Sequence, residues 1–144
     1  MRVDFYQLTR DPAEAVVPLI ARNTLAAGER LLVVSDDEAQ LTRIGDALWS
    51  RTPESFLAHG RAGKRDAARQ PVLLASDLDS GNGARFVVLA DGQWREPEGF
   101  SRAFLLFTGA TIEDARRLWT EIGRREGLER HFWKQEGGKW RESA

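Results

Sequence analysis

The stretch Arg30-Leu31-Leu32-Val33-Val34-Ser35-Asp36-Asp37-Glu38 carries the clearest fold information in the chain. Residues 30–34 form a continuous apolar run, which is typical of a strand buried in a parallel sheet. Ser35 and Glu38 stand at the spacing of a capping box, so we expect a helix to begin here with Ser35 as its cap. The expected core face of that helix consists of Leu41, Ile44 and Leu48, with Trp49 at its margin.

The residues before this stretch predict a strand followed by a helix. Val3 to Leu8 alternate as a first strand, and Asp11 stands where it can cap a helix that has Pro12 at its first position. Glu14 would complete a capping box, and Gly28 is the expected stop after Ala27. Pro18 lies inside this helix and predicts a kink or a late start.

Three further strands and one long helix follow the central stretch. We expect strands at 71–75, 85–89 and 103–107, with a polar loop at 60–70. Thr111 is the expected cap of the last helix, and Gly127 its end. Its core stripe is expected to be Ile112, Ala115, Leu118 and Ile122. Residues 131–140 predict strand, Gly-Gly turn and strand. Alternating strands and helices favour right-handed crossovers and a largely parallel α/β sheet.

Composition favours one globular domain over residues 1–144. The 144 residues are 42% hydrophobic and 30% charged, with a formal net charge of −1 and no cysteine. Disulfides and Cys-ligated zinc are therefore excluded. Without a basic excess, direct DNA binding is not expected to be the main task, although a local basic face is compatible with the sequence. No apolar run approaches the ~20 residues of a membrane span, so we expect a cytoplasmic protein without membrane contact.

The sequence lacks most known catalytic and ligand-binding motifs. Phosphate-loop, dinucleotide and calcium-loop patterns fail on their required residues, and His59 and His131 lack metal-ligand spacing, so no metal and no cofactor are expected. One alternative remains open. Ser35, Asp36 and Asp77 follow strands, where a small nucleotide-binding or hydrolytic protein would place its site. Helix capping and helix-dipole stabilisation explain Ser35 and Asp36 more simply.

The last helix presents a charged and aromatic flank. Arg116 precedes Trp119 by three residues, with a gap at Gly123 one turn further. A guanidinium can fork onto a carboxylate while an apolar group packs beside an indole, which is one way to hold a free C-terminus. The alternative is an ordinary solvated face in which Glu113 pairs with Arg117.

A second segment carries a family resemblance. The run Asp46-Ala47-Leu48-Trp49-Ser50-Arg51-Thr52-Pro53-Glu54-Ser55-Phe56-Leu57-Ala58-His59 resembles the signature segment of chi subunits of bacterial DNA polymerase III. Supporting likenesses extend the resemblance over essentially the whole chain. They are Phe5-Tyr6, Gly28, Asp37-Glu38, the segment Arg116 to Trp119, Trp133-Lys134-Gln135 and Gly137-Gly138.

The resemblance implies a Rossmann-like, three-layer fold with a C-terminal hairpin and a non-catalytic role at the replication fork. It implies that the chain grips the acidic C-terminal tail of single-stranded DNA-binding protein, and so contacts DNA only indirectly. Arg116 matches the family arginine that meets the tail's carboxylate, and Trp119 matches the nearby aromatic residue. Leu105 or Leu106 is expected to line the same pocket.

The resemblance also implies a second partner, the psi subunit or an equivalent clamp-loader component. Its docking is linked to Trp49, Pro53, Phe56 and Leu57, with at least one of the last two expected to be buried. This chain departs from the family at Ile112, where other members can carry a lysine. That departure predicts a weaker basic ridge, or one shifted towards Arg124 and Arg125.

Overall fold

The computed structural model describes residues 1–50, 57–79, 81–136 and 139–143. One sheet contains eight strands in the order β3-β4-β2-β5-β6-β1-β7-β8, and only β8 is antiparallel to its neighbour. The strands are β1 (Arg2–Gln7), β2 (Leu31–Val34), β3 (His59–Arg61), β4 (Val72–Ala75), β5 (Phe86–Leu89), β6 (Arg102–Phe107), β7 (Glu129–Glu136) and β8 (Lys139–Ser143). The helices are α1 (Ala13–Ala26), α2 (Glu38–Ser50) and α3 (Ile112–Gly123). This is the expected Rossmann-like α/β fold with a C-terminal hairpin.

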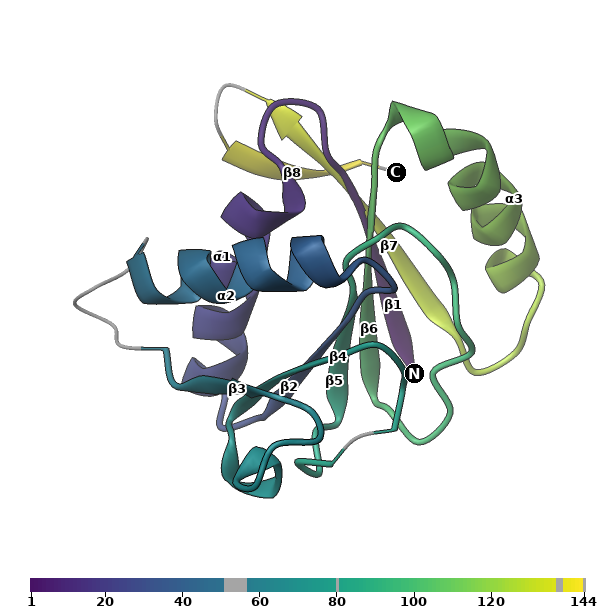
Figure 1. Cartoon of the computed structure of the whole chain (residues 1–144). Coiled ribbons are helices and arrows are strands. Elements are labelled where there is room, and N and C mark those ends of the chain that lie inside the picture. The colour runs from purple at the N-terminus through teal and green to yellow at the C-terminus, as the bar shows by residue number, and fades with distance from the viewer. Residues whose placement is uncertain (51–56, 80, 137–138, 144) are drawn as a thin grey trace.

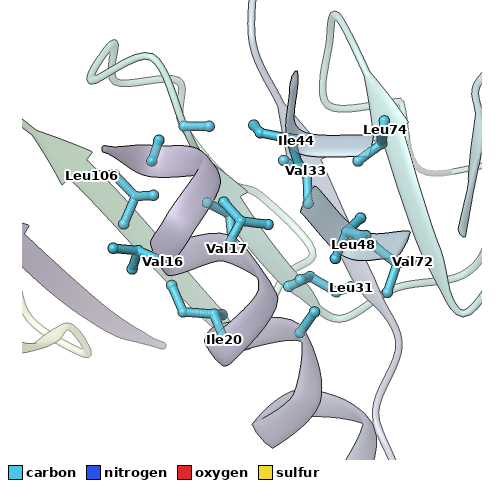
Figure 2. Close-up of a cluster of buried hydrophobic side chains, with 14 of the residues drawn as sticks. Val16, Val17, Ile20, Leu31, Val33, Ile44, Leu48, Val72, Leu74 and Leu106 are labelled. Carbon is cyan, nitrogen blue, oxygen red and sulfur yellow. The ribbon is translucent and has the colours of Figure 1, made fainter. Parts of the chain in front are cut away.

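The helices cover opposite faces of the sheet. Figure 1 shows α1 and α2 on one side and α3 on the other. Beneath α1 and α2, side chains such as Val17, Ile44 and Leu48 meet Val33 and Leu74 of the sheet (Figure 2). Every residue of β2 is buried, as its continuous apolar run predicted. Three layers therefore enclose two hydrophobic cores, one on each face of the sheet.

A separate core lies beneath α3. Ala115, Leu118 and Ile122 are buried there together with Val3 and Phe5 of β1. The alternation along β1 thus points Val3 and Phe5 towards α3, while Tyr6 packs against the core beneath α1. This alternation matters for the site, because it sends neighbouring residues of one strand to two different environments.

Two predicted helix caps are wrong in their partners. At α2, Asp37 is the cap, because its carboxylate accepts hydrogen bonds from the backbone N–H of Ala39 (3.0 Å) and Gln40 (3.2 Å). The Ser35 hydroxyl instead accepts from the Asp37 N–H at 3.1 Å. At α1, Pro12 occupies the cap position without a side-chain bond, and Asp11 accepts from Gln135 on β7 at 2.6 Å. A long-range partner thus replaces the predicted cap at α1, whereas at α2 the nearby residue Asp37 takes the place of Ser35.

Other boundaries also differ from expectation. α1 continues through Pro18 and ends before Gly28, whose φ of +79° suits a residue without a side chain. α3 ends at Gly123, four residues before Gly127. Thr111 occupies its cap position as expected, but the Thr111 hydroxyl accepts from the backbone N–H of Thr108 and makes no capping bond to α3. The stretch predicted as a loop contains β3 and a short 3-10 helix, Ala67–Arg69.

Within the part of the chain that the structure describes, no helix combines the length and the apolar character needed to cross a bilayer. The longest, α1, has 14 residues, against the ~20 that a span requires.

Candidate functional site

A pocket lies between α3 and four neighbouring strands of the sheet. Its volume is about 280 Å³. α3 forms one wall, and β1, β6, β7 and β8 form the other. The lining residues are Gln7, Phe107, Ile112, Ala115, Arg116, Trp119, Phe132, Lys134 and Ser143. The pocket therefore contains both members of the predicted arginine–tryptophan pair.

Aromatic rings make the apolar part of this pocket. Trp119 meets Phe5 edge-on at 5.2 Å between ring centroids and Phe132 at 5.6 Å. Phe107 contacts Phe132 at 5.6 Å, also edge to face. Such edge-to-face packing is the favoured geometry for aromatic rings. The rings hold one another in place, so the pocket offers a fixed apolar lining to an incoming side chain.

Arg116 supplies a positive charge at the pocket. Its side chain is 66% exposed, and Nη1 lies 3.2 Å from the carboxylate of Glu113 one turn earlier. Arg117 pairs instead with Asp114. The alternative in which Glu113 pairs with Arg117 is therefore wrong, because each arginine takes the acid three residues before it. Exposed pairs of this kind are weak, so Arg116 can exchange Glu113 for another carboxylate.

The expected gap at Gly123 is filled. The guanidinium of Arg130, on β7, lies 4.2 Å from the ring centroid of Trp119 and donates a hydrogen bond to the Trp119 carbonyl. A Cβ at position 123 would come within 2.5 Å of Arg130 Nη1. Gly123 therefore makes room for an internal arginine rather than for a ligand, and Arg130 fixes the orientation of the indole.

Other residues assigned to this site by resemblance lie elsewhere. Leu105 is 1% exposed and borders a different hollow, on the other side of α3, while Leu106 is buried beneath α1. Arg124 follows the end of α3 and does not line the pocket. Ile112, the position at which this chain departs from the resemblance, does line it. Which of these side chains reach the pocket depends on where α3 lies on the sheet.

Several lining residues had no predicted role. Phe132 and Lys134 are neighbours on one face of β7, and Gln7 lies beside Lys134 in the sheet. Their alternation within the predicted C-terminal strand was visible in the sequence. What the sequence did not show is that β7 lies next to β1, because that pairing joins segments more than 100 residues apart.

The second predicted surface is only partly described. Trp49 is 53% exposed at the end of α2, and its ring contacts that of His59 on β3 at 5.2 Å. Leu57 is 2% exposed within the core beneath α2, so its side chain is not available for docking. Its burial confirms that at least one of Phe56 and Leu57 is buried. Pro53 and Phe56 lie outside the described residues.

The alternative site after the strands consists of groups that already have partners. The Ser35 hydroxyl is shared between Asp37 and Gln40, and the Asp36 carboxylate lies 3.2 Å from Arg95. Asp77 accepts a hydrogen bond from its neighbour Asp79 at 2.9 Å. Among the residues the structure describes, no group of three His, Cys, Asp or Glu side chains is placed to hold a metal ion. These groups shape turns and helix starts.

A charged cluster occupies the opposite face of β1 and β7. The buried carboxylate of Asp4 accepts hydrogen bonds from Arg2 (2.9 Å), Arg102 (2.7 Å) and the indole of Trp133 (2.9 Å). Burial alone would raise the pKa of Asp4, but the bonds from Arg2, Arg102 and Trp133 hold the pKa below its ordinary value. Both arginines therefore share one buried carboxylate.

Comparison with known proteins supplies a family. The family described as "DNA polymerase III chi subunit, HolC" matches residues 1–131. DNA polymerase III subunit chi of Escherichia coli (strain K12) is 36% identical over 78 residues. That match covers 49% of this chain and 53% of the relative, so it spans about half the length of each. The expectation of an accessory subunit without its own active site agrees with this family. The chain belongs to the family of DNA polymerase III chi subunits.

Proposed function

We propose that this chain is a non-catalytic accessory subunit of the replication machinery that holds the acidic C-terminal tail of single-stranded DNA-binding protein. The observation that carries the proposal is the pocket beneath α3, where Arg116 stands beside the aromatic lining of Trp119, Phe107 and Phe132. A tail that ends in an apolar residue and a carboxylate, preceded by acids, complements this combination of rings and cations.

The proposed tail would insert its terminal side chain among the rings and leave its acids at the rim. Apolar burial and charge-assisted hydrogen bonds then act together at one short peptide end. Arg116 can leave Glu113 for the incoming carboxylate at small cost, because both side chains are exposed. Contact with DNA would be indirect, through the tail-bearing protein, which agrees with the chain's net charge of −1.

A second partner completes the proposed role. We assign the surface around Trp49 to the psi subunit or an equivalent component of the clamp loader, because an exposed tryptophan is the residue type most enriched at binding hot spots. The two surfaces lie on different helices, α2 and α3, on opposite faces of the sheet (Figure 1). One chain could thus hold two partners at once, in the cytoplasm where replication proceeds.

The test is a titration of a fluorescent peptide that copies the acidic tail, followed by anisotropy. Arg116→Ala is expected to weaken binding about tenfold, because a charge-assisted hydrogen bond contributes about 1.5–3 kcal/mol and solvent exposure places this one at the low end. Raised salt should weaken the wild-type complex. Arg117→Ala is the matched control, since Arg117 is equally exposed on the same helix but does not line the pocket. Equal affinity of wild type and Arg116→Ala would remove Arg116 from the site.

A further inference from the structure

The segment that leads from β3 towards β4 carries the densest positive charge in the chain. Residues 61–69 contain four cations, Arg61, Lys64, Arg65 and Arg69, and one acid, Asp66. Nine residues therefore hold a net charge of +3, in a chain whose formal net charge is −1. The rest of the chain is correspondingly acidic, so this positive charge is a local feature. We call residues 61–69 the basic loop.

Three of the four cations have no acidic partner. Lys64, Arg65 and Arg69 are exposed and form no ion pair with any residue that the structure describes. Arg61 does pair, with Glu38 of α2. The arginines within α2 and α3 also pair with nearby acids. The basic loop therefore differs from the other charged surfaces in that its charge is available to an external anion.

Main-chain hydrogen bonds hold the basic loop against the sheet. The N–H of Ala62 donates to the Leu74 carbonyl of β4 at 2.8 Å, and further N–H donors close successive turns within the loop. Arg30 donates to the carbonyls of Ala68 and Asn82, both at 3.0 Å, and so adds a cation that also lacks an acidic partner. Cations that are already fixed in place lose little conformational entropy when an anion binds.

The residues between these cations indicate which partner the basic loop fits. Residues 61–69 contain no apolar side chain larger than that of alanine, and no aromatic ring. They lack the large anchors that dominate binding at protein interfaces, and they lack a ring on which a nucleobase could stack. What remains is attraction to closely spaced negative charges, which the phosphate groups of a nucleic acid supply.

We propose that the basic loop, together with Arg30, is a sequence-independent contact for the phosphate backbone of nucleic acid. Lys64, Arg65 and Arg69 each neutralise a phosphate in this contact. It goes beyond the proposed function, because the loop follows β3 at one edge of the sheet, whereas the pocket beneath α3 is lined from β6, β1, β7 and β8. So few cations give a weak contact, which is sufficient for a subunit that other partners already hold near DNA.

The test titrates the whole chain into fluorescent DNA at low ionic strength and follows anisotropy, with single-stranded and duplex DNA of equal length. Wild type should bind the duplex at least as tightly as the single strand, because the duplex has the higher charge density and the loop offers no ring to an unpaired base. A loop variant that combines Lys64→Gln, Arg65→Gln and Arg69→Gln should bind both about tenfold more weakly. Its dependence of log affinity on log salt should be shallower by about two to three.

The matched control combines Arg10→Gln, Arg22→Gln and Lys139→Gln. It removes the same net charge from three exposed positions on separate parts of the chain, and DNA binding should weaken by about twofold or less. The loop variant should melt no lower than wild type, because it removes only exposed, mutually repelling charges. It should also bind the acidic tail peptide as wild type does.

The outcomes separate the basic loop from the tail-binding pocket. Absence of DNA binding by wild type, or equal losses in the loop variant and the control, overturns the role of the loop. A strong preference for single strands overturns it as well, since base stacking would then dominate. If the loop variant loses the tail peptide and keeps DNA, the loop serves an acidic peptide instead. Tail binding itself is judged by the wild-type peptide titration, which none of these DNA results decides.

Discussion

Cations lie on both faces of the sheet around β1 and β7, and their partners differ between the two faces. On the α1 face, Arg2 and Arg102 share the buried carboxylate of Asp4. On the α3 face, Lys134 has no acidic partner among the described residues, and Arg116 has only an exposed one. Removing a buried carboxylate that pairs with cations destabilises the fold, whereas a charge left open at an apolar pocket is available to a ligand. We therefore expect loss of the Asp4 carboxylate on the α1 face to lower stability, and loss of the Arg116 cation on the α3 face to weaken peptide binding without lowering stability.

The largest effect is expected on the α1 face. Asp4→Ala should lower the free energy of unfolding by about 3 kcal/mol, because it removes the shared partner of two arginines and leaves the Trp133 indole N–H without its acceptor. Chemical denaturation measures this loss. Asp114→Ala is the control, since Asp114 and Arg117 form a largely exposed pair whose loss should change stability by less than about 0.5 kcal/mol. Equal losses in both variants would contradict the distinction between the faces.

Trp119→Ala should affect both stability and binding, because Trp119 belongs to the core and to the pocket. Its ring packs on Phe5 and Phe132 and lies beneath Arg130, so we expect a loss of about 2 kcal/mol in unfolding free energy. Tail-peptide affinity should fall by about tenfold or more. Calorimetry measures the loss of stability and fluorescence anisotropy the loss of peptide affinity, both on the same preparation. Arg116→Ala, in contrast, should weaken binding without lowering stability.

Acid should remove the stability that the ionised Asp4 carboxylate contributes on the α1 face. The folded pKa of Asp4 lies below its unfolded value, so its ionised form contributes stability that is fully present above the unfolded pKa. That contribution is lost as the pH falls through the folded pKa, which means below about pH 4. Thermal melts of wild type should therefore decline more steeply below pH 4 than those of Asp4→Asn. Parallel declines would show that other carboxyls, such as Asp91, dominate acid unfolding.

The smallest effect in the tail assay is expected at Trp49, away from both faces of β1 and β7. Trp49→Ala should change stability by no more than about 0.5–1 kcal/mol, since about half of the side chain is exposed. The affinity for the tail peptide should be unchanged, whereas capture of a psi subunit on an affinity resin should fall. A weakened tail peptide would show that the surfaces on α2 and α3 are coupled.

Local patterns predicted most of the secondary structure. The apolar run of β2, the helical spacing of Leu41, Ile44 and Leu48, and the C-terminal hairpin all depend on neighbours within a few residues. One error appeared where a distant residue competed for a local group. Asp11 binds Gln135 on β7 instead of capping α1, because that partner lies 124 positions away in sequence and adjacent in space. No window of a few residues contains such a contact.

The candidate site shows the same division. The sequence alone determined that Arg116 and Trp119 share the flank of one helix, since their spacing of three residues fixes this. Only the tertiary structure decided what faces that flank. It placed Arg130 in the space at Gly123, sent Leu105 to another hollow, and brought Lys134 to the pocket wall opposite Arg141. These relations follow from the strand order β6-β1-β7-β8, which joins segments from both ends of the chain and leaves no trace in local periodicity.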